Sequence, residues 1–214
     1  MTLANETFQL AASYTIGSYI LPGAPIEELS NFSNTKIKVN IDTCSKIIQG
    51  IKDGDYDLGL IETPIFDDEL IYHEWIENEM VFCSKTELPH SIEEKDIKNY
   101  NLICREATSA TRLLVGDFFK KFGISHNSFQ SLKEINNATA AIQSVKWSKV
   151  NPKNPTLTIV SRLAIEEEIK RKELFVSRFK ERMMQHKYYI IHTKEKRENQ
   201  IIQMIIAQLK KQNF

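Results

Sequence analysis

A change of apolar period near the N-terminus constrains the fold of this 214-residue chain more than any other feature of its sequence. Phe8, Leu10 and Ala12 recur at every second position, which predicts a strand buried on at least one face. From Ile16 onward the apolar residues follow helical spacing, so the strand gives way to a helix across residues 13–15. Unsatisfied backbone amides and the positive end of a helix dipole meet at such a junction, which suits a carboxylate or a phosphate.

The alternation of strand and helix continues beyond this junction. Residues 36–42 alternate as a strand with Ile41 among its inward positions, residues 46–52 are predicted to form a helix, and residues 58–61 a short buried strand. This order is typical of a parallel sheet covered by helices, in which ligands bind beyond the carboxyl ends of the strands. We expect four polar residues at that edge: Ser13, Thr15, Glu62 and Thr63.

Two crossovers are predicted to divide the chain into two lobes. Strands are expected at 70–75 and 79–84, joined by a turn at residues 77–78, and the polar segment 86–90, which contains a proline, is the first crossover. The second crossover lies just before a strand that begins at Lys187. These boundaries define the lobes: 7–86 with 187–214 for lobe I, and 90–183 for lobe II.

Lobe II repeats the arrangement that opens the chain. A strand at 100–104 leads into a hydroxyl-rich turn at 105–111 and then into an amphipathic helix that Gly123 ends. Ser109 and Thr111 lie in this turn, as two hydroxyl residues do at the first junction. Two such turns that face each other would line a cleft between the lobes.

Four motifs carry a resemblance to a known family: Ala-Ala-Ser-Tyr-Thr-Ile-Gly-Ser-Tyr-Ile-Leu-Pro at 11–22, Asp-Leu-Gly-Leu-Ile-Glu at 57–62, Arg-Glu-Ala-Thr-Ser-Ala-Thr-Arg at 105–112, and Ile-Val-Ser-Arg-Leu-Ala-Ile-Glu-Glu-Glu at 159–168. Their order and spacing resemble the effector-binding domain of LysR-type transcriptional regulators. The resemblance covers nearly the whole chain and implies an α/β, two-lobed type-2 periplasmic-binding-protein-like fold with two crossover strands. It also implies that a small metabolite, a carboxylate or another anion, binds between the lobes.

The resemblance implies a ligand site with residues from both lobes: Ser13, Thr15, Glu62, Thr63, Ser109, Thr111, Asn136 and Ser161. The hydroxyls have an alternative role as helix caps. Arg105 and Arg112 could touch the ligand or form surface salt bridges. Glu62 could accept a hydrogen bond from a ligand amine or hydroxyl, or pair with a local lysine or arginine.

Two features depart from the family pattern. Residues 146–155 replace an expected Gly-rich turn with a loop that has two prolines and no glycine. We expect this loop to be a surface excursion, with Trp147 covering the cleft as the alternative. The N-terminal winged helix-turn-helix of the family is also absent, so we expect a truncated regulator, with a free-standing binding domain as the alternative.

The resemblance also implies how the domain associates. Family members form a homodimer or tetramer, in which these domains pair side by side and antiparallel through the first helix and the strand at 36–41. DNA would be contacted only through the missing N-terminal domain. The charge agrees with this expectation, because 28 basic and 28 acidic residues leave no net charge to bind nucleic acid directly.

Several classes of protein are not indicated by the sequence. No segment reaches the ~18 apolar residues of a membrane span, and the first residues do not resemble a signal peptide, so we expect a cytoplasmic protein without membrane contact. Three cysteines, Cys44, Cys83 and Cys104, are expected to be free thiols, with a redox switch as the alternative.

No catalytic or metal-binding motif is evident either. The five histidines lack metal-ligand spacing, and no phosphate loop, nucleophile elbow or catalytic carboxylate pair occurs. We therefore expect that the protein is not an enzyme and that it binds neither a metal nor a cofactor. A transporter-type solute-binding protein stays open as an alternative, as does an enzyme on the same scaffold, such as a prephenate dehydratase-like domain.

Overall fold

The computed structural model describes three stretches of the chain: residues 7–33, 35–63 and 65–212. These residues form two compact units, each with its own apolar core. The first unit comprises the described residues up to Glu77 together with those from Lys187 onward, and the second unit is 78–186.

Both passages between the units lie inside strands. β4 (Leu70–Ser84) carries the chain out of the first unit, and β10 (Met184–Thr193) carries it back. The predicted pair of strands with a turn at residues 77–78 is wrong, because β4 is one unbroken strand of 15 residues. Asn78 is buried and hydrogen-bonded within it. The sequence predicts the first passage at the polar segment 86–90. In the structure it lies earlier in the chain, within β4.

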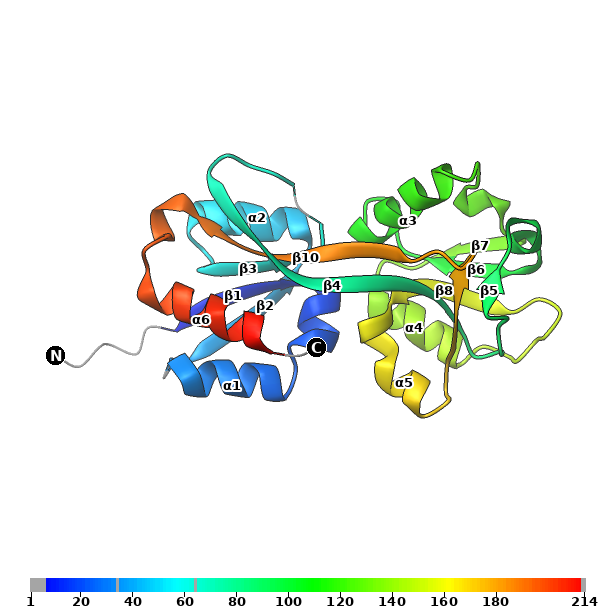
Figure 1. Cartoon of the computed structure of the whole chain (residues 1–214), viewed down its shortest axis with the longest axis horizontal. Coiled ribbons are helices and arrows are strands. Elements are labelled where there is room, and N and C mark those ends of the chain that lie inside the picture. The colour runs from blue at the N-terminus through cyan, green and yellow to red at the C-terminus, as the bar shows by residue number, and fades with distance from the viewer. Residues whose placement is uncertain (1–6, 34, 64, 213–214) are drawn as a thin grey trace. The chain divides into compact units, whose positions relative to one another are not determined.

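The first unit contains a mixed sheet with helices on both faces. Its strands are β1 (Phe8–Ser13), β2 (Ile37–Asp42) and β3 (Leu58–Ile61), followed by the adjoining parts of β10 and β4. β1 pairs in parallel with both β2 and β3, whereas β10 runs antiparallel to β3. Figure 1 shows α2 (Cys44–Asp53) over one face, and α1 (Ala24–Ser33) and α6 (Gln200–Lys211) over the other.

Helix α2 forms where the sequence supplies a cap at each end. The Thr43 hydroxyl accepts a hydrogen bond from Lys46 N at 3.4 Å, and Gly54 closes the helix with a φ of 80°. The helix begins at Cys44, two residues before the predicted start, because Thr43 is its cap. Its buried face belongs to one apolar cluster: Ala11, Ile47, Ile48, Ile51, Ile61, Leu70 and Ile191.

Large apolar side chains on α1 and β2 are among those of the first unit that are exposed. The prediction that Ile41 points inward is wrong, because β2 is the edge strand and Ile41 is 42% exposed. One side of Ile41 covers Gly17, where an added Cβ would lie 2.7 Å from Ile41 Cγ1. Phe32 on α1 is 47% exposed.

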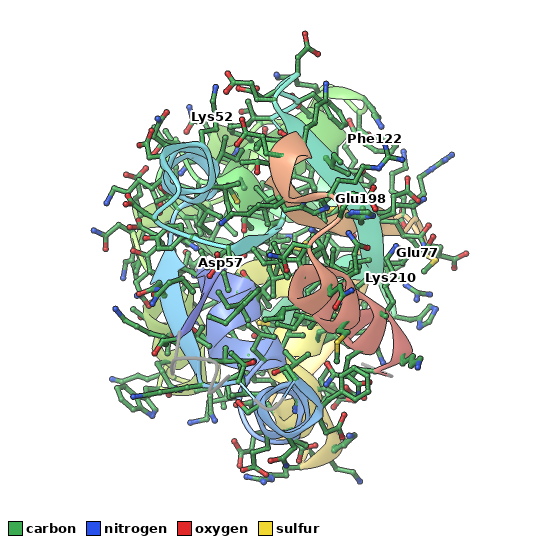
Figure 2. All side chains as sticks on the ribbon, turned by 90° about the vertical axis from the view of Figure 1, so that its left-hand side faces the viewer. Lys52, Asp57, Glu77, Phe122, Glu198 and Lys210 are labelled. Atoms are coloured by element: carbon green, nitrogen blue, oxygen red, sulfur yellow. The ribbon has the colours of Figure 1, made fainter. Side chains whose placement is uncertain are left out.

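Polar contacts tie distant segments of the first unit together. Lys52, which Figure 2 labels, lies at the end of α2. It pairs with Asp67 at 2.7 Å and with Glu69 at 2.9 Å. Trp75 in β4 donates from its indole Nε1 to the Leu209 carbonyl of α6 at 2.9 Å. The last helix is thereby held against a strand that enters the second unit.

The second unit repeats the arrangement of sheet and helices. Its further strands are β5 (Ser91–Ile92), β6 (Asn101–Cys104), β7 (Ser131–Glu134), β8 (Thr156–Ser161) and β9 (Phe175–Phe179). β6 pairs in parallel with β7 and β8, and β4 runs antiparallel to β8 and β9. In Figure 1, α3 (Ala110–Lys120) covers one face, and α4 (Ala138–Lys146) and α5 (Glu166–Lys170) cover the other. No helix in the described part of the chain is both long and apolar enough to cross a membrane.

Aromatic rings form the centre of the second core. Phe119 on α3 is fully buried, and its ring lies 6.2 Å from Phe82, 6.0 Å from Phe129 and 5.9 Å from Phe179 between centroids. Such offset and edge contacts add to the stability that burial alone provides. The helical apolar spacing predicted for this segment therefore marks the buried face of α3 at Phe119, whereas Leu113, which belongs to the same predicted pattern, is 56% exposed.

The loop at 146–155 is held in place by its own hydrogen bonds. Asn151 N donates to the buried Thr86 hydroxyl at 3.1 Å, and Asn151 Oδ1 accepts from the amides of Lys153 and Asn154. Trp147, at the start of the loop, is 80% exposed. The loop is therefore an ordered surface excursion, as the sequence predicts.

Burial lowers the pKa of four histidines. Burial, followed by the charge on Arg112, lowers the pKa of His126 to about 4, and burial lowers the pKa of His186 to about 4. His73 and His192 lie with their Nε2 atoms 3.0 Å apart, and burial lowers the pKa of each. The folded protein therefore holds these rings neutral at a pH where the unfolded chain binds protons.

Acidification should accordingly destabilise the fold. Because the unfolded chain takes up more protons than the folded protein, the free energy of unfolding should fall as the pH drops from about 6.5 toward about 4. His126→Gln should make this fall smaller by about 1–2 kcal/mol. Urea unfolding at several pH values measures the effect, with the exposed His90→Gln as the matched control. The same fall for wild type and His126→Gln would contradict the prediction.

Candidate functional site

The polar edge of the first unit lies where β1 and β3 end. The two strands pair in parallel with Ala12 opposite Leu60, so Ser13 and Glu62 follow at the same edge of the sheet. Both side chains are buried, Ser13 at 2% exposed and Glu62 at 9%. The predicted meeting of Ser13, Thr15, Glu62 and Thr63 at one edge agrees with this register.

Glu62 binds the backbone of the first junction. Thr15 N donates to Glu62 Oε1 at 3.3 Å, and Thr15 is itself buried. The Glu62 carboxylate therefore accepts a hydrogen bond from a backbone amide that we expected to bind a ligand anion. No lysine, arginine or histidine within residues 7–33, 35–63 and 65–212 forms an ion pair with Glu62, so the alternative of a local salt bridge does not hold there.

The hydroxyls of the first junction do not act as helix caps. Thr15 precedes a short π-helical turn, Ile16–Ile20, and its side chain makes no capping hydrogen bond. Ser13 Oγ is buried and has no hydrogen-bond partner among the described residues. A buried hydroxyl without a partner is costly, and it is the kind of group that a bound ligand would satisfy.

Cys44 is a neighbour of Glu62 that the sequence did not predict. Burial, followed by the negative charge of Glu62, raises the pKa of the Cys44 thiol to about 11 and outweighs backbone hydrogen bonds from Glu62 and Thr63. The thiol is therefore protonated at neutral pH. Thr63, which follows Glu62 in the chain, is half-buried. Only the parallel order of β1, β2 and β3 could have indicated that these residues meet.

In the second unit, Ser109 caps a helix. Its hydroxyl accepts a hydrogen bond from Arg112 N at 3.0 Å at the start of α3, which leaves the hydroxyl proton available to donate. Thr111 lies in the first turn of α3 and is half-buried. It lines a cavity of about 10 Å³, room for one water molecule, together with Arg105, Arg112 and His126.

Two arginines hold the turn that leads into α3. Arg105 is buried and contacts Glu106 through Nε at 2.9 Å and Nη2 at 3.0 Å. Arg112 Nη1 donates to the Arg105 carbonyl at 2.7 Å and to Glu134 at 3.2 Å. Both side chains are therefore engaged in the structure of the turn. Arg105 Nη2 also reaches the Asn136 carbonyl at 3.4 Å.

Asn136 and Ser161 have different surroundings from those expected. Asn136 is exposed, and the cap of α4 is Asn137, whose Oδ1 accepts from Ala140 N at 2.9 Å. The sequence predicts that this helix begins at Asn136, which is two residues before its start at Ala138. Ser161 ends β8 as predicted, but its buried hydroxyl donates to Asn78 Oδ1 at 2.7 Å. Asn78 is thus a second residue that the sequence did not predict.

The polar groups of the two units differ in chemistry. The edge of the first unit carries the Glu62 carboxylate and the Ser13 hydroxyl without a described partner, whereas the second unit presents the N-terminal amides of α3 beside two arginines that already bind Glu106 and Glu134. No group of three or more His, Cys, Asp or Glu side chains that could hold a metal ion occurs among the residues that the structure describes. The arrangement suits recognition of a small polar molecule by hydrogen bonds.

Comparison with known sequences identifies a family with this arrangement. A family model described as the LysR substrate binding domain matches residues 2–213. An Escherichia coli K12 protein named "Uncharacterized HTH-type transcriptional regulator YeiE" is 26% identical over 169 residues, which are 77% of this chain and 54% of that protein. The chain spans a little more than half the length of the curated relatives that it matches.

Solved structures show the same fold. The Synechocystis PCC6803 CcmR regulatory domain in complex with 2-PG has a TM-score of 0.78 at 19% identity, over 95% of each chain. The effector-binding domain of QuiR in complex with shikimate has a TM-score of 0.75 at 15% identity, over 97% of this chain and 96% of that one. These similarities confirm the predicted periplasmic-binding-protein-like fold.

Removal of two buried serine hydroxyls should have unequal effects on stability. Ser161→Ala leaves Asn78 Oδ1 buried without its donor and should lower the free energy of unfolding by about 1–3 kcal/mol. Ser13→Ala deletes a hydroxyl without a partner among the described residues, so stability should change by less than about 0.5 kcal/mol or rise. Urea unfolding measures both variants. Equal losses would contradict the assignment of a structural role to Ser161 alone.

Proposed function

Since the chain belongs to the family of LysR substrate-binding domains, we propose that it is the ligand-sensing regulatory domain of a LysR-type transcriptional regulator. It would bind a small metabolite in the interlobe cleft that the family resemblance implies. The binding would bias a DNA-binding domain elsewhere in a longer protein, as far as the affinity for the ligand differs between two states. The match to an HTH-type regulator, of which the aligned residues make up 54%, supports the proposal.

The ligand site of this proposal uses the polar residues of both units: Ser13, Thr15, Glu62, Thr63, Ser109, Thr111, Asn136 and Ser161. The buried Ser13 hydroxyl without a partner is the single observation that supports it most strongly. Thr111 is the counterpart in the second unit, because it is half-buried beside Arg105 at the start of α3. Ser161 has the weakest support, since its hydroxyl already binds Asn78.

The proposed effector carries a carboxylate or another anionic group. The second unit supports this, because the N-terminal amides of α3 favour negative charge. Titles of two solved relatives name 2-PG and shikimate as their ligands. We propose that this chain acts by binding and not by catalysis, and that it acts in the cytoplasm, where its DNA target lies.

A thermal-shift screen of small carboxylates and phosphates, with 2-PG and shikimate included, tests the proposed site. A ligand at 100 times its dissociation constant should stabilise the domain by about 2.7 kcal/mol. Ser13→Ala and Thr111→Ala should weaken this stabilisation, whereas the exposed Thr139→Ala, the matched control, should not. If a ligand stabilises the wild type and both site variants alike, the proposed site is wrong.

We also propose that copies of the domain pair antiparallel through α1 and β2, as the family resemblance implies. The exposed Phe32 on α1 and Ile41 on the edge strand β2 support this surface. Phe32→Glu should shift the mass in light scattering toward the monomer. Phe66→Glu, at an exposed phenylalanine outside this surface, should leave the mass unchanged. A wild-type monomer at high concentration would contradict the pairing.

A further inference from the structure

The buried carboxylate of Glu62 lacks the cation that usually accompanies such a group. It is 9% exposed and accepts one hydrogen bond from the described residues, from Thr15 N. Buried charges are costly unless they are paired. The second unit follows this rule, because the Glu79 side chain, 10% exposed, holds both Nε and Nη2 of Arg178.

The lysines of the first unit do not neutralise Glu62. Lys52 pairs with Asp67 and Glu69, Lys46 pairs with Asp42, and Lys196 pairs with Asp57 at 2.8 Å. The nearby Cys44 thiol is protonated and brings no positive charge, because burial and then the negative charge of Glu62 raise its pKa. The carboxylate therefore stands at this edge without a counter-charge from the described residues.

Glu62 also has hydrogen-bonding capacity to spare. A carboxylate accepts about four hydrogen bonds, and the contact from Thr15 N is long at 3.3 Å, against a usual length of about 2.9 Å. Ser13 Oγ, at the end of the adjacent strand, is buried and accepts no hydrogen bond from the described residues. Glu62 and Ser13 Oγ can therefore each accept a further hydrogen bond at this edge.

We propose that Glu62 makes the first unit selective for an effector with a protonated amine, which donates hydrogen bonds to the Glu62 carboxylate and to Ser13 Oγ. This inference rests on the proposed function and specifies the chemical class of the effector. A plain anion at this edge would meet a like charge, whereas an ammonium group supplies both the donor and the missing counter-charge. The effector is then a zwitterion of the amino-acid type, with an ammonium group for this edge in addition to the anionic group of the proposed function.

Titration of the ¹⁵N-labelled chain with three simple ions tests this chemistry. Methylammonium should shift the Thr15 and Thr63 amide resonances in a saturable manner. Tetramethylammonium, a cation that cannot donate hydrogen bonds, and acetate should not. Glu62→Gln keeps the shape of the side chain and an acceptor for Thr15 N, so it should fold, but methylammonium should bind it about tenfold more weakly or not at all.

Each other outcome overturns the inference. An equal methylammonium response in wild type and Glu62→Gln would show that the charge is not used, and a response to acetate at Thr15 would show that the edge takes anions. If none of the three ions shifts the Thr15 or Thr63 amide resonance, no such subsite exists. The proposed function has a separate test, since an effector without an amine that stabilises wild type, but not Ser13→Ala, would uphold the sensor and overturn only the amine.

Discussion

The parallel pairing of β1 with β2 and β3 is the constraint on which the polar edge of the first unit depends. Parallel strands bring all their carboxyl ends to one edge, so residues from positions 13, 44 and 62 meet although they are far apart in the chain. The strands themselves are fully buried at Leu10, Leu58 and Leu60. Packing of the apolar core therefore fixes the positions of the polar groups. The polar groups do not determine these positions by their own interactions.

Much of the fold could be predicted because the apolar periods of the short elements agree with their final burial. The strands near 8–13, 58–61 and 101–104 and the helix after Ser109 follow this rule. The prediction failed at β4, where Glu77 and Asn78 resemble a turn. In the strand interior, Asn78 Oδ1 accepts a long-range hydrogen bond from Ser161, and no local pattern reveals a partner 83 residues away.

The candidate site was predictable in its members more than in their roles. Polar residues at strand ends marked Ser13, Glu62 and Ser161, and the structure does place them at strand ends. Their roles depend on which partners they bind: Glu62 accepts from the distant Thr15 amide, whereas Ser109 caps α3 by accepting from the nearby Arg112 amide. Hydroxyls and carboxylates that look equivalent in a sequence thus divide into structural groups and groups with unused hydrogen-bonding capacity.

The two tryptophans of the chain stand in unlike surroundings, one in each unit. Trp75 is half-buried, with its indole N–H bound to the Leu209 carbonyl, and Trp147 is 80% exposed at the end of α4. Indole emission depends on the polarity around the ring. The chain therefore contains two intrinsic fluorophores with separable spectra, one reporting on each unit, so that a ligand which alters only one of them could be followed without any added label.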